Sequence, residues 1–109
     1  MMDAPQFSIH RGPTGRPPLV IVVQANDFAR LPTRVVAPLL PASAMPDFGP
    51  EHPRVAPVLS IRSRRYVLNP LGLATIGVHR LGAPVASLAG DDDARRKIQD
   101  ALDVALKPY

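Results

Sequence analysis

Apolar residues recur with the spacing of a helix in the stretch from residue 90 to residue 109. Side chains three or four positions apart share one face of a helix, and the apolar residues here follow that spacing: Ala94, Ile98, Ala101, Leu102 and Ala105. Three aspartates at 91–93 precede them, where the positive end of a helix dipole favours negative charge. Pro108 ends the pattern because it lacks a backbone N–H. The stretch predicts one amphipathic helix that packs on the rest of the chain.

The remaining apolar segments are short and have β character. Residues 19–23 form a continuous run of Leu, Val and Ile, which indicates a strand buried on both faces. Pro38 predicts an edge strand or a bulge, because proline cannot donate to a sheet ladder. Residues 62–64 predict a tight turn between two paired strands. Alternating or β-branched patterns predict further strands at 7–10, 34–40, 54–61, 65–68 and 76–81, and a less regular one at 83–88.

Glycine and proline mark the connections between these segments. Residues 11–18 have the composition of a hairpin loop, and residues 41–53 have that of a surface loop. Several short strands followed by one helix predict a mostly β fold, a small β-barrel or curled antiparallel sheet with a long C-terminal α-helix. The 109 residues show no internal repeat, so we expect a single domain over residues 1–109.

Composition narrows the classes of function. The chain has no cysteine, which excludes disulfide frameworks, thiol nucleophiles and cysteine metal sites. No apolar run approaches the roughly 20 residues that span a membrane, and the N-terminal residues do not resemble a secretory signal. We therefore expect a cytoplasmic protein without membrane contact. Fourteen prolines divide the chain into short segments, in agreement with a β-rich fold.

Positive charge is concentrated in the body of the chain. Thirteen basic and nine acidic residues give a net charge of +4. Residues 4–90 hold nine arginines against Asp27, Asp47 and Glu51, a balance of +6. Such a surface suits nucleic acid, an acidic protein segment, or simply solvent. An acidic protein segment would be steered toward it.

Motifs that carry catalysis are absent. The sequence has no GxSxG, phosphate-loop, HExxH or GxGxxG motif. His10, His52 and His79 are isolated, and the run of aspartates at 91–93 lacks the spacing of a metal loop. We therefore expect no catalytic residues, no metal and no cofactor.

Arg62, Arg64 and Arg65 form the densest basic cluster outside the predicted helix. On a hairpin these arginines could contact phosphate. The chain has no Trp, two Tyr and three Phe, so it offers few platforms for stacking bases, and we expect no direct binding of nucleic acid. The basic residues at 95–97 are spaced to pair with Asp92, Asp93 or Asp100 on the solvent side of the helix.

Four segments, in order, resemble the CcdB family of type II toxin–antitoxin systems. They are Leu19–Gln24 with Pro38-Leu39, Pro57–Ile61 with Tyr66, Gly82 with the 85–88 segment, and Ile98-x-x-Ala101-Leu102. The resemblance implies an SH3-like barrel of the kind shared with MazF-type ribonuclease toxins. It also implies a homodimer, a CcdA-like antitoxin, a role in plasmid maintenance, and inhibition of DNA gyrase through its A subunit.

In the CcdB family the C-terminal tail contacts gyrase. By position, the gyrase-binding residues here would be Asp103, Leu106, Lys107, Pro108 and Tyr109. The best-known member ends in Trp-Gly-Ile, whereas this chain ends in Lys-Pro-Tyr. The leading hypothesis is a toxin that poisons gyrase by binding, without catalysis. Two alternatives stay open: a MazF-like endoribonuclease that uses Arg62 or Arg65 to stabilise the transition state, and a non-toxic relative that only binds antitoxin.

Overall fold

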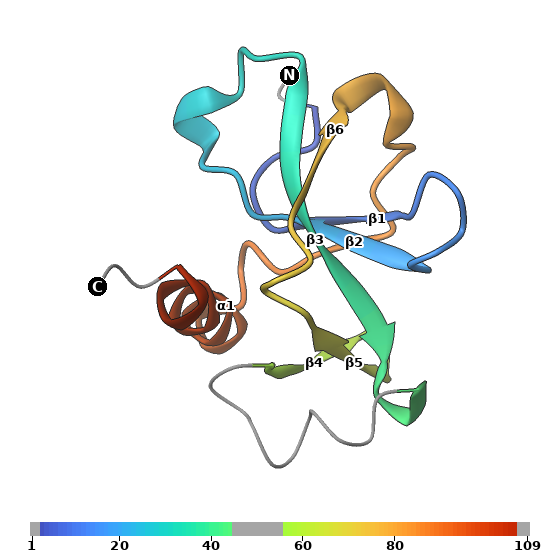
Figure 1. The fold of residues 1–109 in the computed structure, drawn as a ribbon, viewed down its shortest axis with the longest axis vertical. Coiled ribbons are helices and arrows are strands. Elements are labelled where there is room, and N and C mark those ends of the chain that lie inside the picture. The colour runs from blue at the N-terminus through green and yellow to red at the C-terminus, as the bar shows by residue number, and fades with distance from the viewer. Residues whose placement is uncertain (1–2, 45–55, 107–109) are drawn as a thin grey trace.

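The computed structural model describes residues 3–44 and 56–106, which form one curled antiparallel sheet and a C-terminal helix (Figure 1). In this part of the chain the α-helix is α1 (Asp92–Ala105). Three short 3-10 helices are η1 (Asn26–Phe28), η2 (Ala42–Ala44) and η3 (Val78–Arg80). The strands are β1 (Ser8–Arg11), β2 (Leu19–Val22), β3 (Thr33–Pro41), β4 (Val58–Ile61), β5 (Arg64–Leu68), β6 (Ala74–Gly77) and β7 (Ala86–Ser87).

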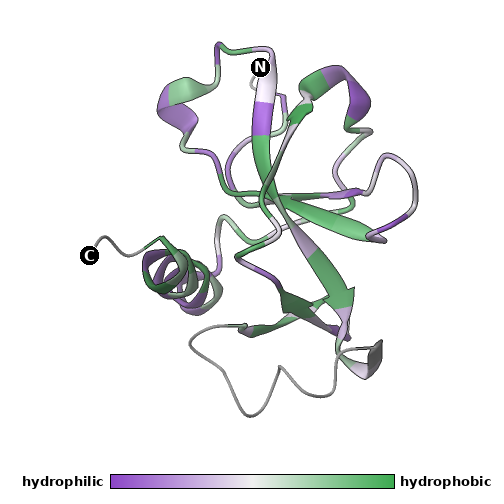
Figure 2. Ribbon diagram, in the orientation of Figure 1, coloured by the Kyte–Doolittle hydropathy of each residue, from purple (hydrophilic) through white to green (hydrophobic). Residues whose placement is uncertain are grey.

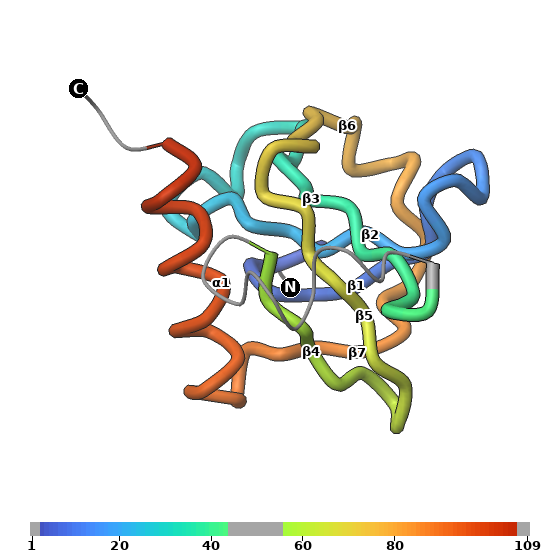
Figure 3. The backbone as a smooth tube through the Cα atoms, turned by 60° about the horizontal axis from the view of Figure 1, so that its bottom comes forward, coloured from blue at the N-terminus to red at the C-terminus, as the bar shows by residue number. Residues whose placement is uncertain are grey.

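The nine-residue strand β3 is the centre of the sheet. The strand order is β4-β5-β3-β2-β1-β7, and β6 pairs with the first half of β3 on the side where β5 pairs with its second half. All pairs are antiparallel. Figure 3 shows α1 running along one side of this curled sheet. The predicted mostly β fold with a long C-terminal helix is confirmed.

Pro38 does not mark an edge or a bulge, so that prediction is wrong. It lies in the central strand β3 and pairs with Val20 of β2 in an unbroken register. On the other side of β3, the ladder with β6 ends at Val36 and the ladder with β5 begins at Leu39. The carbonyl oxygen of Pro38 accepts from Asn69 N at 3.1 Å. In an antiparallel strand the nitrogen and the carbonyl group of one residue point to the same side, so the nitrogen of Pro38 faces the gap between the β6 ladder and the β5 ladder. A proline fits there because no strand requires an N–H at that point.

The apolar face of α1 covers the core as its spacing predicts. Ala94, Ile98 and Ala101 are buried in one cluster with residues of the sheet, among them Ile21 and Leu39. Figure 2 shows hydrophobic residues along β2 and β3. The Asp91 carboxylate accepts from Ala94 N at 3.0 Å and caps the helix. Two ion pairs connect the predicted partners: Arg95–Asp92 at 3.7 Å and Lys97–Asp93 at 3.2 Å.

Arg34 is buried, although the arginines suggested a solvated surface. It is 4% exposed, and its side chain donates to backbone carbonyl oxygens only. Nε donates to Ala4 O at 3.1 Å. The four terminal N–H groups donate to the carbonyl oxygens of Leu31 (2.7 Å), Thr33 (2.9 Å), Asp3 (2.8 Å) and Ala29 (3.1 Å). All five N–H donors of the guanidinium are thus satisfied, and they tie the N-terminal segment to the residues that precede β3.

His10 is also buried, at 1% exposure, and has a structural role. Its Nδ1 donates to the carbonyl oxygen of Gly82 at 2.7 Å, and its Nε2 lies 2.8 Å from the Ser8 hydroxyl. These bonds fasten the segment before β7 to β1. His79 is exposed, and His52 lies outside the described residues. In the ranges 3–44 and 56–106, no helix is both long and apolar enough to cross a membrane.

Candidate functional site

Three arginines and a tyrosine surround one cavity of about 370 Å³, which we call the arginine hollow. Arg11 ends β1, Arg62 lies in the turn between β4 and β5, and Arg64 begins β5. Tyr66 follows two residues after Arg64, so both side chains lie on the same face of β5. The apolar part of the lining consists of Leu19, Ile61 and Val85.

The β4–β5 hairpin holds two of these arginines in fixed positions. Ile61 pairs with Arg64, so the turn has only two residues, Arg62 and Ser63. Both have a left-handed backbone, with φ of 52° and 68°. A turn of this type matches the twist of the two strands. Arg11 is brought to the same place by the pairing of β1 with β2, where it lies opposite Leu19.

The arginine hollow is suited to bind phosphate. Its lining contains three guanidinium groups and no carboxylate. The arginines are exposed, and the ion pairs within residues 3–44 and 56–106 are the two on α1, which lie outside the hollow. Guanidinium groups bind phosphate oxygens through two parallel N–H bonds. The half-buried Tyr66 adds a hydroxyl that can exchange a proton.

The predicted cluster of Arg62, Arg64 and Arg65 does not line one cavity: Arg62 and Arg64 line the arginine hollow, and Arg65 meets Arg64 only at a separate hollow beside η2. Arg65 lies on the opposite face of β5, in a groove with Asp91, Asp93 and Lys97 at the start of α1. Arg11 replaces it in the arginine hollow. The sequence carried no signal for Arg11, because it lies about fifty positions from the hairpin and meets it only through the order of the strands.

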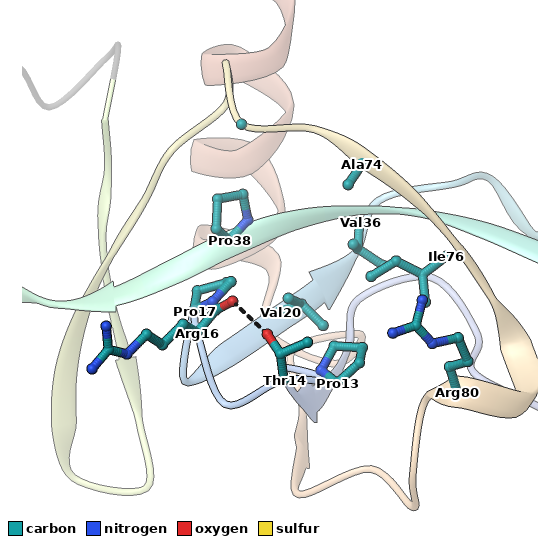
Figure 4. A pocket seen from close by; sticks show the side chains of 11 residues that line it. Pro13, Thr14, Arg16, Pro17, Val20, Val36, Pro38, Ala74, Ile76 and Arg80 are labelled. Atoms are coloured by element: carbon teal, nitrogen blue, oxygen red, sulfur yellow. Dashed lines mark hydrogen bonds between the residues drawn. The ribbon is translucent and has the colours of Figure 1, made fainter.

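A second cavity, of about 290 Å³, lies over β2, β3 and β6, and we call it the apolar cleft (Figure 4). Thr14, Arg16 and Arg80 supply its polar side chains. The Thr14 hydroxyl donates to the carbonyl oxygen of Arg16 at 3.1 Å. The remaining lining residues are Pro13, Pro17, Val20, Val36, Pro38, Gly72, Ala74 and Ile76. The loop at 11–18 contributes to both cavities.

Of the residues assigned to gyrase binding by position, Asp103 and Leu106 are exposed at the end of α1. Leu106 is 64% exposed. Lys107, Pro108 and Tyr109 lie outside the described residues. Among the residues that the structure describes, no group of three or more His, Cys, Asp or Glu side chains could hold a metal ion.

Solved structures share this fold over nearly its whole length. One is described as an endoribonuclease in complex with its cognate antitoxin from a mycobacterial species; its TM-score is 0.74 at 19% identity, and the match covers 96% of this chain and 97% of that chain. Another is described as an endoribonuclease from a mycobacterial species. Its TM-score is 0.71 at 21% identity, and the match covers 100% of this chain and 98% of that chain. A search of curated protein sequences gives no significant match.

These structures contradict the expectation that the chain is not an enzyme, because both proteins on this fold are described as endoribonucleases. At this identity the likeness itself establishes only the fold. The expectation rested on the absence of contiguous catalytic motifs, and a cluster such as Arg11, Arg62 and Arg64, which come from β1 and from the β4–β5 hairpin, leaves no such motif in a sequence. The family model described as "CcdB protein" matches residues 6–107, in agreement with the resemblance of the four segments. The chain therefore belongs to the CcdB family.

Proposed function

We propose that this chain is the toxin of a toxin–antitoxin module and that it cleaves RNA at the arginine hollow. The observation that carries the proposal is the convergence of Arg11, Arg62 and Arg64 on one cavity with the hydroxyl of Tyr66. The endoribonucleases that share the fold support it. The proposal departs from the expectation of no direct contact with nucleic acid.

In the proposed reaction the ribose 2′-oxygen attacks the adjacent phosphorus, and the bond from phosphorus to the 5′-oxygen breaks. Negative charge grows on the phosphoryl oxygens as the five-coordinate transition state forms. The three guanidinium groups stabilise that charge. Tyr66 donates its proton to the departing 5′-oxygen, and solvent takes the proton of the 2′-hydroxyl. The products are a 2′,3′-cyclic phosphate and a 5′-hydroxyl.

Incubating the purified protein with a long single-stranded RNA in excess EDTA tests this activity. We expect discrete fragments with 2′,3′-cyclic phosphate and 5′-hydroxyl ends, because arginines replace a metal cation as the source of positive charge in the hollow. The fragment ends are identified by mass spectrometry. The proposal would be contradicted if the RNA stays intact with an equimolar amount of protein while expression of the same protein arrests bacterial growth.

We further propose that the toxin acts in the cytoplasm as a homodimer and as a single domain over residues 1–109. A basic body, with a balance of +6 over residues 4–90, favours an acidic antitoxin. The structure described as bound to its cognate antitoxin supports a partner of this kind.

A second candidate function is binding to the A subunit of DNA gyrase, and it rests on the exposed end of α1. Leu106 presents a large apolar side chain there, beside the exposed Asp103. Exposed apolar side chains of this kind serve as anchors in protein interfaces. The residues at 107–109 would extend this contact.

If this second function holds, Leu106→Asp should weaken binding to a gyrase A fragment by about tenfold or more, since burial of one leucine is worth roughly 1.5–3 kcal/mol. The matched control is Leu71→Asp, because Leu71 is similarly exposed, at 74%, on the β5–β6 connection. Titration calorimetry measures both. Absence of binding by the unaltered protein would exclude gyrase as a target.

A further inference from the structure

The floor of the apolar cleft is built from side chains that offer no hydrogen bonds. Val20 and Val36 lie deepest, at 3% and 1% exposure. Ile76 of β6 and Pro38 of β3 close the sides, as Figure 4 shows. A ligand that enters the cleft must therefore present an apolar group to this floor.

A nucleobase does not fit this lining well. Every base carries an N–H group on its pairing edge, which needs an acceptor when it is buried. Among the lining side chains, only the hydroxyl of Thr14 can accept, and the guanidinium groups of Arg16 and Arg80 only donate. An aliphatic or aromatic side chain of a protein has no such requirement. The chemistry of the floor thus favours a protein segment over RNA.

The positively charged rim of the cleft favours a segment that carries negative charge. Arg16 and Arg80 stand at different edges of the cavity, and no acidic residue lines it. Figure 4 shows Arg16 extending away from the floor, where it can meet residues on either side of an inserted side chain. Carboxylates on both sides of an apolar anchor would pair with these guanidinium groups at the edge of the interface.

We propose that the apolar cleft binds a segment of an acidic antitoxin in which one or two apolar anchor residues are flanked by Asp and Glu. This inference rests on the proposed toxin function, and it assigns a place to the partner. The apolar anchor rests on Val20, Val36 and Ile76, and the flanking carboxylates pair with Arg16 and Arg80.

The position of the cleft gives such a segment influence over the arginine hollow. The β1–β2 loop at 11–18 supplies Thr14 and Arg16 to the cleft and Arg11 to the hollow. The segment at 78–85 supplies Arg80 to the cleft and Val85 to the hollow. A protein bound in the cleft therefore contacts two segments that also line the hollow.

The test uses the full chain and a fluorescein-labelled peptide of about ten residues, with a central Phe-Leu pair flanked by Glu on both sides. Fluorescence anisotropy gives the affinity, and NMR spectra of the isotope-labelled protein show where the peptide binds. Ala74→Phe fills the cleft from β6, and Thr75→Phe is its control because the next residue of a strand faces the opposite side. Arg16→Glu with Arg80→Glu reverses the rim charge, and Arg30→Glu with Arg96→Glu makes the same change of net charge elsewhere on the exposed surface.

We expect micromolar binding, with NMR shifts at Val20, Val36 and Ile76. Ala74→Phe and the double rim variant should weaken binding at least tenfold, while both controls change it less than about twofold. A peptide with Ser-Ser in place of Phe-Leu should bind at least tenfold more weakly.

Three results would overturn the inference: unchanged affinity in Ala74→Phe, shifts confined to the arginine hollow, or a short RNA that displaces the peptide from the cleft. A monomer produced by Ala74→Phe but not by Thr75→Phe, seen by sedimentation, would instead make the cleft an interface between copies. RNA cleavage is scored separately, so an inactive protein that still binds the peptide would overturn only the proposed activity.

Discussion

Removing the arginines of the hollow should abolish RNA cleavage while the fold stays intact. We expect Arg64→Ala to lower kcat/KM by about 10²–10³-fold, the effect of removing one donor that stabilises charge in a transition state. For Arg62 the better replacement is Asn, because φ is 52° at this position and Asn tolerates left-handed backbone. Cleavage of a fluorogenic RNA measures each variant.

The control for the loss of charge is Arg96→Ala, since Arg96 is exposed on α1, away from the hollow. Arg64→Lys keeps the charge but loses the paired N–H bonds, so it should restore only part of the rate. Urea unfolding should give the same midpoint for all of these proteins. Full activity in the Arg62, Arg64 and Arg11 variants would show that cleavage takes place elsewhere.

Arg34→Met should destabilise the fold by about 3–5 kcal/mol, because it leaves five backbone carbonyl oxygens, one in a buried and four in partly buried hydrogen bonds, without their donor. Methionine has a similar length and is apolar, so the loss measures the hydrogen bonds rather than a cavity. Arg34→Lys should recover little, since an ammonium has three donors and these acceptors need five.

The midpoint of urea unfolding, followed by circular dichroism, measures this loss. Arg30→Met is the control, because Arg30 is a nearby but exposed arginine and should change stability by less than about 0.5 kcal/mol. A change below about 1 kcal/mol in Arg34→Met would mean that water replaces the guanidinium, and that the segments at 3–4 and 29–33 are held by other contacts.

Local patterns predicted the elements whose causes are local. The apolar stripe of α1 lies in the core, the aspartates at 91–93 stand at the N-terminus of the helix, and a tight turn joins β4 to β5. These follow from spacing, capping and turn chemistry within a few residues. Where the position of a residue depends on a neighbour that is distant in the sequence, the local pattern gave no prediction or a wrong one. Pro38 is tolerated in a central strand only because β5 takes over from β6 beside it.

The candidate sites depended on such distant neighbours. Arg34 looks like any other arginine in the sequence, yet carbonyl groups from residues 3–4 and 29–33 converge on it. Arg62 and Arg64 were singled out as a basic cluster, but the partner that completes the hollow is Arg11, which no spacing rule connects to them. The family resemblance supplied the fold and suggested a toxin. The expectation of no catalysis, which the endoribonucleases on this fold contradict, came from looking for contiguous motifs, and arginines from separate elements leave none.

The pairing of β1 with β7 determines when the sheet can be completed during synthesis of the protein. Ser8 lies opposite Ser87, so this ladder joins residues that are 79 positions apart in the sequence (87 − 8). Contacts of such long range require a large loop to close before they form, and sheets that depend on them fold slowly. On a ribosome that adds about 5–20 residues per second, β1 lacks one of its two neighbours until β7 has emerged. Val85, a wall of the arginine hollow, belongs to the same late segment. The arginine hollow is therefore incomplete in the growing chain, and any activity that needs it begins only after this segment has been made and has paired with β1.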